Sequence, residues 1–415
     1  MGGGLLQLVA YGAQDVYLTG NPQITFFKAV YRRHTNFAIE AIQQTFNGTP
    51  GYGQRVTSTI ARNGDLIHRV YLALDLAGAS TDDFCKFFGL RLINYVEVEI
   101  GGQKIDKHYS HWMYIWNELS LPVAKKAGYY DMVGAYGGTP GGSMQKQLYI
   151  PLEFWFCRNV GLALPLIALQ YHEVKINLSF ETAEKCKGAA VAPSSGFSAS
   201  LWVDYIFLDT DERRRFAQLS HEYLIEQLQF TGQEAVQSRE IKPKLNFNHP
   251  CKELIWFVTQ SDADHNNWMN YASDSTGDHK LVSGDNTLAL MSAKISPSSK
   301  GDTKNPTATA KLVLNGNDRF AQRDGLYFNL IQPFQHHENV PSNAGINVYS
   351  FALKPEEHQP SGTLNMSRID TAVLNLSMNK SIVDANLSKL NLSIFAVNYN
   401  VLRIMSGMGG IAYSN

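Results

Sequence analysis

The feature that most constrains the fold is an internal repeat, because similar segments occur twice in the same order along the chain. IEAIQQTFNG at 39–48 resembles IEQLQFTG at 225–232, and KINLSF at 175–180 resembles VLNLSM at 373–378. Three further pairs keep this order, namely 60–74 with 245–259, 99–103 with 313–317, and 203–208 with 397–402. The first of these three aligns Val70-Tyr71-Leu72 with Ile255-Trp256-Phe257. The shared order predicts a tandem duplication of units of about 190 residues.

Each unit has the pattern of short antiparallel strands. Residues 96–100 alternate valine or isoleucine with glutamate, which is typical of a strand with one buried face. Gly101-Gly102 and Asn315-Gly316 follow such strands and suit two-residue hairpin turns. The predicted fold class is therefore all-β, with two tandem eight-stranded antiparallel jelly rolls (a double jelly roll) and short helices in the connections.

Three segments receive more specific assignments. Residues 108–120 place Trp112, Trp116 and Leu119 on one face at helical spacing, which predicts a helix. Residues 210–224 begin with residues suited to capping and are expected to form a helix between the two units. The aromatic run YIPLEFWF at 149–156 is interpreted as a core strand in preference to a sugar-binding platform.

The domain organisation follows from the repeat and from the segment that precedes it. Asn21 and Pro22 suit the N-cap and first position of a short helix, with an apolar stripe and basic residues in 26–33. We expect this arm to pack under the first barrel and to serve in docking, because it lies outside both repeats. The predicted boundaries are an N-terminal arm 1–26, a first jelly roll 27–212, a linker 213–224 and a second jelly roll 225–415.

Composition excludes several functional classes. The 415 residues contain 36 Lys and Arg against 37 Asp and Glu, so the chain lacks the basic excess expected for direct nucleic-acid binding. The four cysteines form no C-x-x-C pair, which favours free thiols in a reducing compartment. The N-terminus lacks a signal-peptide pattern, and the apolar run at 161–169 is too short to insert in a membrane. A cytosolic origin is expected.

The candidate motifs for catalysis, cofactor binding or metal binding each lack part of the pattern that the chemistry requires. His172-Glu173 and His221-Glu222 lack the second histidine of a zinc protease motif. His336-His337-Glu338 would need a loop to converge on a metal, so no metal site is expected there. Residues 407–412 fit G-x-G-x-x-A, but no helix can follow, so they are interpreted as a flexible glycine tail. The sequence predicts no enzyme, no catalytic residue and no cofactor.

The sequence contains candidate sites for N-linked glycans. N-x-[ST] sequons occur at Asn47, Asn177, Asn365, Asn375, Asn379, Asn386 and Asn391. Asn379 and Asn386 are the most loop-like, and together with Asn391 they are the candidate N-linked glycan sites. The alternative is that the sequons are unused, as is usual in a cytosolic chain.

Several long segments resemble the major capsid proteins of nucleocytoplasmic large DNA viruses, closest to those of algal viruses of the chlorovirus type. The segments that carry the resemblance are 3–33, 101–109, 161–175, 204–219, 222–232, 350–363 and 398–410. They include GGLLQLVAYGAQDVYLTGNPQITFFKAVYRR and DYIFLDTDERRRFAQL, and they reach both ends of the chain. The segments 77–91, 120–145, 181–199, 261–310 and 380–392 lie outside the resemblance and are interpreted as surface loops.

The resemblance implies a structural subunit of an icosahedral virus shell. It implies a double jelly roll, a homotrimeric capsomer of pseudo-hexagonal outline, and tiling of the capsid over an internal membrane into which the chain does not insert. It also implies neighbouring capsomers and minor capsid proteins as partners, outward loops that can carry N-linked glycans, and assembly in the host cytoplasm. Two alternatives stay open: a minor capsid paralogue at special positions, and a carbohydrate-binding β-sandwich protein.

Overall fold

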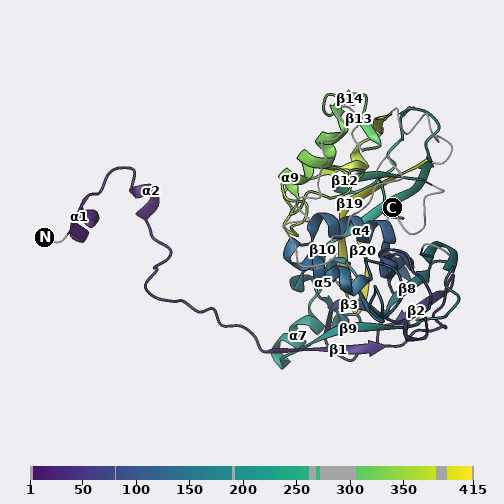
Figure 1. Cartoon of the computed structure of the whole chain (residues 1–415). Coiled ribbons are helices and arrows are strands. Elements are labelled where there is room, and N and C mark those ends of the chain that lie inside the picture. The colour runs from purple at the N-terminus through teal and green to yellow at the C-terminus, as the bar shows by residue number, and fades with distance from the viewer. Residues whose placement is uncertain are drawn as a thin grey trace. The chain divides into compact units, whose positions relative to one another are not determined.

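A computed structural model describes residues 3–79, 81–188, 192–260, 268–271, 305–379 and 390–413. The chain divides into two compact units, Met1–Phe37 and Ala38–Asn415 (Figure 1). The first unit contains two short helices, α1 (Gly3–Val9) and α2 (Val16–Thr19), and no buried residue in either helix. No described helix is long and apolar enough to cross a membrane.

The prediction of a short helix that begins at Pro22 is wrong. Residues 22–36 form no regular helix or strand, and the helical turns lie earlier in the chain. Asn21 adopts a left-handed backbone conformation with φ of 48°, whereas an N-cap residue needs an extended one. An apolar stripe on its own supplies too little stability for such a short helix, since isolated helices of this length are marginal in water.

A five-stranded sheet and a four-stranded sheet form the first sandwich. Sheet A has the order β1 (Phe37–Gln44), β9 (Ser198–Leu208), β3 (Leu66–Asp75) and β6 (Gln147–Pro151), and β7 (Leu164–Pro165) also pairs with β3. Sheet B has the order β2 (Arg55–Thr59), β8 (Val174–Phe180), β4 (Ile93–Ile100) and β5 (Gln103–Tyr109). The registered pairs within these sheets are antiparallel.

The second sandwich repeats this plan. Sheet C has the order β10 (His221–Ala235), β19 (Leu390–Met405), β12 (Pro250–Gln260) and β16 (Asn347–Ser350), with β17 (Leu364–Asn365) beside β12 and β20 (Met408–Ile411) beside β19. Sheet D has the order β11 (Glu240–Ile241), β18 (Ala372–Met378), β13 (Thr307–Leu314) and β14 (Asn317–Asp318), with β15 (Arg323–Asp324) beside β13. The strand β10 begins inside the segment predicted as a linker.

The sheet orders confirm the duplication predicted from the sequence. Each main strand of sheet A has a counterpart at the same place in sheet C, and sheets B and D match in the same way. All five sequence pairs fall on matching strands: β1 with β10, β3 with β12, the β4–β5 hairpin with the β13–β14 hairpin, β8 with β18, and β9 with β19. This is the predicted double jelly roll.

One detail of the repeat alignment is wrong by a single residue. Val70 and Leu72 face the interior of the first sandwich, whereas the residues aligned with them, Ile255 and Phe257, face outward from sheet C. The interior position in β12 belongs to Trp256, which lies in the core of the second sandwich. A one-residue shift moves every side chain of a strand to the opposite face, and apolar residues on both faces of β12 hide that shift.

Helices lie in the connections. They are α3 (Phe88–Arg91), α4 (Ser110–Ser120), α5 (Val123–Val133), α6 (Trp155–Arg158), α7 (Thr210–Gln218), α9 (Gln332–His336) and the π-helix η6 (Tyr327–Ile331). The 3₁₀ turns are η1 (Ala77–Ala79), η2 (Val160–Leu162), η3 (Leu166–Ala168), η4 (Ala183–Cys186) and η7 (Met366–Arg368). The predicted helix at 108–120 is confirmed as α4.

Two other sequence assignments need correction. The helix predicted over 210–224 ends at Gln218, and its N-cap is Asp209, whose carboxylate accepts from the Thr210 N–H. Residues 221–224 instead belong to β10, because pairing with β19 buries their neighbours. The strand predicted over 149–156 ends at Pro151, since α6 begins at Trp155.

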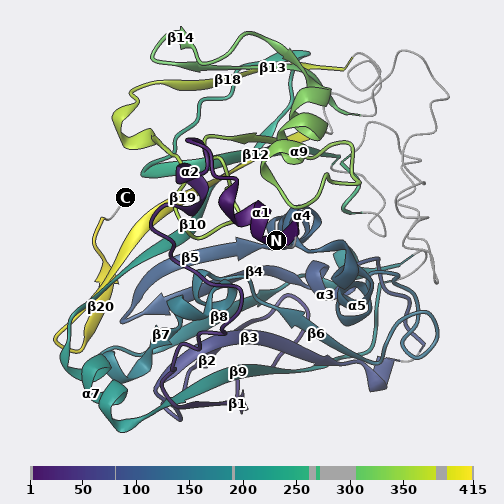
Figure 2. The same cartoon turned by 90° about the vertical axis from the view of Figure 1, so that its left-hand side faces the viewer.

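Figure 2 shows the two sandwiches of the second unit one above the other, with β5 of the first lying beside β10 of the second. Trp112 of α4 contacts Phe395 of β19. The interior of the second sandwich is one apolar cluster that includes Trp256 and Phe328. A larger cluster fills the first sandwich and continues to the outer face of sheet C, where it includes Ile255 and Phe257. The two sandwiches therefore share a continuous apolar contact.

The hairpin glycines provide a matched test of the fold. Gly101 and Gly102 both have positive φ, of 58° and 84°. A Cβ on Gly101 would overlap the His172 ring, whereas one on Gly102 would meet nothing within 4 Å. We expect Gly102→Ala to lower the unfolding free energy by about 1–2 kcal/mol through backbone strain. Gly101→Ala should cost more, because His172 must also move.

Urea denaturation of both variants measures this difference. Equal losses for the two substitutions would contradict the close packing of His172 on the hairpin.

Candidate functional site: the junction between the two sandwiches

The outer face of sheet C is covered by side chains of the first sandwich. Trp112 of α4 lies edge-on to Phe395 of β19, with ring centroids 5.7 Å apart. His111 lies against Phe257 of β12, and its Nδ1 forms a 2.8 Å hydrogen bond with the Tyr271 hydroxyl. Burial lowers the pKa of His111 to about 3, so its ring is neutral. The junction is thus apolar at its centre.

Ion pairs cross the junction beside this apolar centre. The Arg158 guanidinium of α6 lies 2.8 Å from the Glu226 carboxylate of β10 and 4.3 Å above the Trp116 ring. Lys252 of β12 is fully buried, and its Nζ lies 2.7 Å from the same carboxylate. Glu226 therefore joins a cation of the first sandwich to a cation of the second. Removing one member of such a group leaves a buried charge without its counterion.

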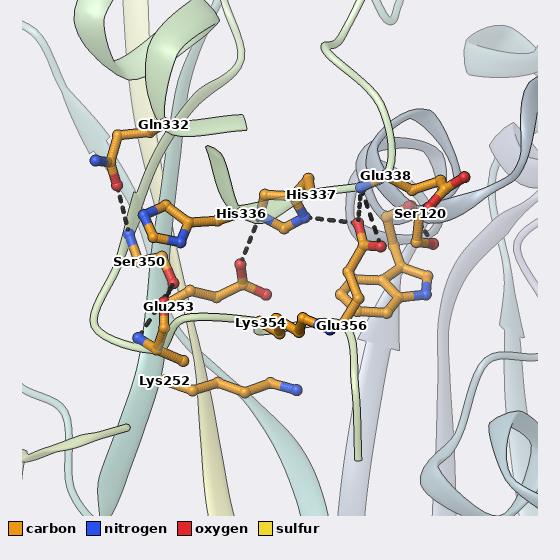
Figure 3. A network of polar contacts seen from close by, with 12 residues as sticks. Ser120, Lys252, Glu253, Gln332, His336, His337, Glu338, Ser350, Lys354 and Glu356 are labelled. Carbon is orange, nitrogen blue, oxygen red and sulfur yellow. Dashed lines mark hydrogen bonds and ion pairs between the residues drawn. The ribbon is translucent and has the colours of Figure 1, made fainter. Parts of the chain in front are cut away.

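A second charged group lies next to Lys252 along β12 (Figure 3). The His337 ring is buried between two carboxylates, with Nε2 3.0 Å from Glu253 and Nδ1 2.7 Å from Glu356. Burial opposes the charged ring, but the two carboxylates outweigh it and raise the pKa of His337 to about 9. Burial likewise opposes the charged form of Glu253, yet His337 and Lys252 hold its pKa below the usual range.

Hydrogen bonds to backbone groups complete the junction. Asp106 of β5 accepts from the Leu228 N–H of β10 at 3.0 Å and pairs with His108 at 2.9 Å. The Gly409 N–H donates to His172 Nδ1 at 3.1 Å. This last contact corrects the expectation of a flexible glycine tail, because residues 408–411 form β20 and pair with β19. The turn before β20 uses Ser406 and Gly407, both with positive φ.

The histidines that the sequence analysis named as candidates do not converge on one site. His336 and His337 point to different partners, since the Nδ1 of His336 bonds to the Leu353 carbonyl at 2.9 Å. His221 bonds to the Phe216 carbonyl at 2.8 Å. Among the described residues, no group of three His, Cys, Asp or Glu side chains could hold a metal ion.

The candidate glycan sites lie in different surroundings. Asn379 directly follows β18, is half-buried, and its N–H donates to the Pro306 carbonyl at 2.8 Å. Asn391 lies in β19, where it pairs with Ala235 on one side and Thr259 on the other. Asn386 lies outside the described residues. Asn379, at the end of a strand, leaves more room for a glycan than Asn391, because Asn391 has a neighbouring strand on each side.

Sequence reasoning missed the charged residues of the junction. One signal was available for Lys252 and Glu253, because charges directly before the apolar run LIWFV are unusual in a buried strand. No local signal marks Arg158, Glu226 or His337, which come together only through the tertiary structure.

Comparison with known proteins gives a consistent result. The family profile "Major capsid protein N-terminus" matches residues 25–209, and the profile "Large eukaryotic DNA virus major capsid protein" matches residues 212–410. The chain is 54% identical to the major capsid protein of Pyramimonas orientalis virus and 48% identical to that of Paramecium bursaria Chlorella virus 1, each over 100% of both chains.

Solved structures agree with these matches. A crystal structure of PBCV-1 VP54, fitted into a reconstruction of the virophage Sputnik, is 40% identical and has a TM-score of 0.78, over 94% of this chain and 100% of that chain. The Faustovirus major capsid protein has a TM-score of 0.71 at 15% identity, over 95% of this chain and 94% of that chain, and therefore shares the fold.

The pKa of His337 predicts how stability depends on pH. A histidine whose pKa rises from 6.5 to about 9 on folding stabilises the protein fully below pH 6.5. That contribution disappears as the pH rises through about 9. We expect His337→Gln to lower the Tm at pH 6.5 and to flatten the decline of Tm between pH 6.5 and 9.5.

Calorimetry across this pH range measures both effects, with His34→Gln, an exposed histidine of the N-terminal segment, as the control. If His337→Gln kept the wild-type slope, the charged state of His337 in the folded protein would be disproved.

Proposed function

The chain belongs to the family of major capsid proteins of large eukaryotic DNA viruses and is a structural subunit of the virion shell, and from this premise we propose that it works as a homotrimeric capsomer. In this proposal three copies make a unit of pseudo-hexagonal outline, and such units tile the capsid over an internal membrane. Neighbouring capsomers and minor capsid proteins beneath the shell are its partners, and assembly takes place in the host cytoplasm.

The observation that carries the proposal is the matching strand order of the two sandwiches. A chain with two similar sandwiches supplies two similar outer surfaces, so three chains in a ring present six. A three-fold operator can then produce a unit suited to hexagonal packing. The near balance of 36 basic and 37 acidic residues also favours close packing of many copies, since it keeps their mutual repulsion small.

The N-terminal unit supports a role in assembly. Its large apolar side chains are exposed in an isolated chain, and the most exposed of them are Tyr17, Leu18, Phe26, Phe27, Val30 and Tyr31. Exposed apolar groups in such number are unusual for a surface that meets only water. We propose that neighbouring subunits or inner-shell proteins cover them in the virion.

Light scattering of purified protein tests the homotrimer. We expect a mass three times that of one chain at micromolar concentration, because an obligate capsomer interface buries on the order of 2,000–5,000 Å². A stable monomer under these conditions would count against the proposal.

Deletion of residues 1–26 tests the arm. We expect the truncated chain to keep its thermal unfolding transition and to assemble poorly into particles. The unfolding transition should persist because residues 3–26, the described part of this segment, contribute no side chain to the apolar clusters. Electron microscopy of particles from cells expressing either form is the measurement. Normal particles from the truncated chain would contradict a role in docking.

Mass spectrometry of glycopeptides from virions tests the glycan proposal at Asn379, Asn386 and Asn391. We expect modified peptides from at least one of these sites. Asn379 is favoured over Asn391, because Asn391 has a neighbouring strand on each side. Unmodified peptides at all three would remove them as glycan sites.

A further inference from the structure

Two of the four cysteines lie opposite each other in the first sandwich. Cys85 lies between η1 and α3, and Cys186 is the last residue of η4, which follows β8. An antiparallel bridge pairs Phe84 with Lys187, and this pairing sets Cys85 opposite Cys186. The Cys85 N–H donates to the Cys186 carbonyl at 3.1 Å. Both residues are thiols in the structure, and both are 0% exposed.

The backbone pairing at these cysteines suits a disulfide. Residues opposite each other in an antiparallel pair have Cα atoms about 4.5–5.5 Å apart, and their side chains lie on the same face. Disulfides join residues whose Cα atoms are about 4.4–6.8 Å apart. Cys85 and Cys186 also belong to the same apolar cluster. Little backbone movement is therefore needed to bring the two sulfur atoms into bonding distance.

The charges around Cys186 suit an attacking thiol. Burial raises the pKa of Cys186, and the nearby Cys85 raises it further, because two thiolates this close would repel each other. Arg91 and Lys185 oppose this rise, since their positive charges favour the thiolate. The Arg91 Nε donates to the Lys185 carbonyl at 3.2 Å, which keeps Arg91 beside η4. Because the thiolate is the nucleophile in disulfide exchange, Cys186 is suited to react first.

The cover over the two cysteines is thin. Lys185 is exposed, and Lys86 and Lys187 are half-buried, so each cysteine has a solvent-facing neighbour in the chain. The turn η4 has only four residues, Ala183–Cys186. Local opening of this turn, without unfolding of the sandwich, is enough to admit a small reagent.

We propose that Cys85 and Cys186 form a redox-sensitive pair that stays reduced in a reducing compartment and closes to a disulfide when the folded chain meets a low-molecular-weight disulfide. The Cys186 thiolate attacks one sulfur of that reagent, which releases one thiol and leaves a mixed disulfide on Cys186. The Cys85 thiolate then attacks the Cys186 sulfur and releases the second thiol. The pair gives up two electrons to the reagent, and the two cysteine protons end on the two released thiols.

The disulfide would join two connections of the first sandwich that hydrogen bonds already hold together. The Gly188 N–H donates to the Asp83 carbonyl, and the Ser195 N–H donates to the Asp82 carboxylate, each at 2.8 Å. The new bond would close a loop of about 100 residues, and a disulfide stabilises more when its loop is long. A chain that folds in its reduced form thus becomes harder to unfold in oxidising surroundings outside a cell. The bond forms within one copy, so it does not depend on the homotrimer.

Peptide mapping of the wild-type protein tests the pair without any substitution. Folded protein purified under reducing conditions is incubated with glutathione disulfide and then analysed by mass spectrometry without reduction. We expect one disulfide, between Cys85 and Cys186, with the loss of two hydrogen atoms per chain. Cys157 and Cys251 should stay thiols, because they lie on separate elements, α6 and β12. Glutathione retained on Cys186, a disulfide to another cysteine, or no reaction of the folded chain would each overturn the pairing.

Thermal unfolding with matched variants gives a second measurement. Oxidation of the wild-type protein should raise its Tm by about 5 °C, and a reductant should reverse this shift. Cys85→Ala should remove the shift. Cys157→Ala is the control, because it deletes a buried thiol outside the pair, and it should keep the shift. The same shift in Cys85→Ala, or a wild-type disulfide that leaves the Tm unchanged, would overturn the stabilising role of the pair.

Discussion

The structure depends on burial of both faces of sheet C. The inner face of this sheet packs on sheet D, and its outer face packs on α4 and β5 of the first sandwich. The middle of β12 (LIWFV, 254–258) and the middle of β19 (IFAV, 394–397) are therefore apolar on both faces, whereas strands with one solvent face alternate apolar and polar residues. Because each face is covered by a different body, sheet C connects the two sandwiches into one unit.

The charged residues of the junction add specificity to this apolar contact. Glu226 meets Arg158 and Lys252, and His337 meets Glu253 and Glu356, all with little access to water. Desolvation of buried charges consumes much of the energy that their attraction provides, so such groups are a weak source of stability. Arg158 and Glu226 come from different sandwiches, so their ion pair favours one placement of the two bodies, whereas apolar surfaces tolerate sliding.

The duplicated chain also explains why similar sequence has different surroundings. β1 and β10 carry the same Ile-Glu motif, and sheets A and C have the same strand order, yet only sheet C has a covered outer face. A tandem repeat in one chain necessarily has one internal junction and leaves one surface of each kind without a partner.

The sequence by itself determined the strands, the hairpins, the α4 helix and the duplication, because these follow from local periodicity, turn residues and segment order. The helix predicted from Pro22 does not form, because local preference alone is too weak to hold so short a helix. Residues 221–224 were predicted as helix but form part of β10, because pairing with β19 outweighs their weak helical preference. The sequence also misplaced the alignment of β12 by one residue, since Ile255, Trp256 and Phe257 are all apolar and periodicity cannot choose their face. Only the tertiary structure decided that face, and only it brought Arg158, Glu226 and His337 to one junction. Their contacts join residues far apart in the chain, and such contacts depend on how two folded bodies meet.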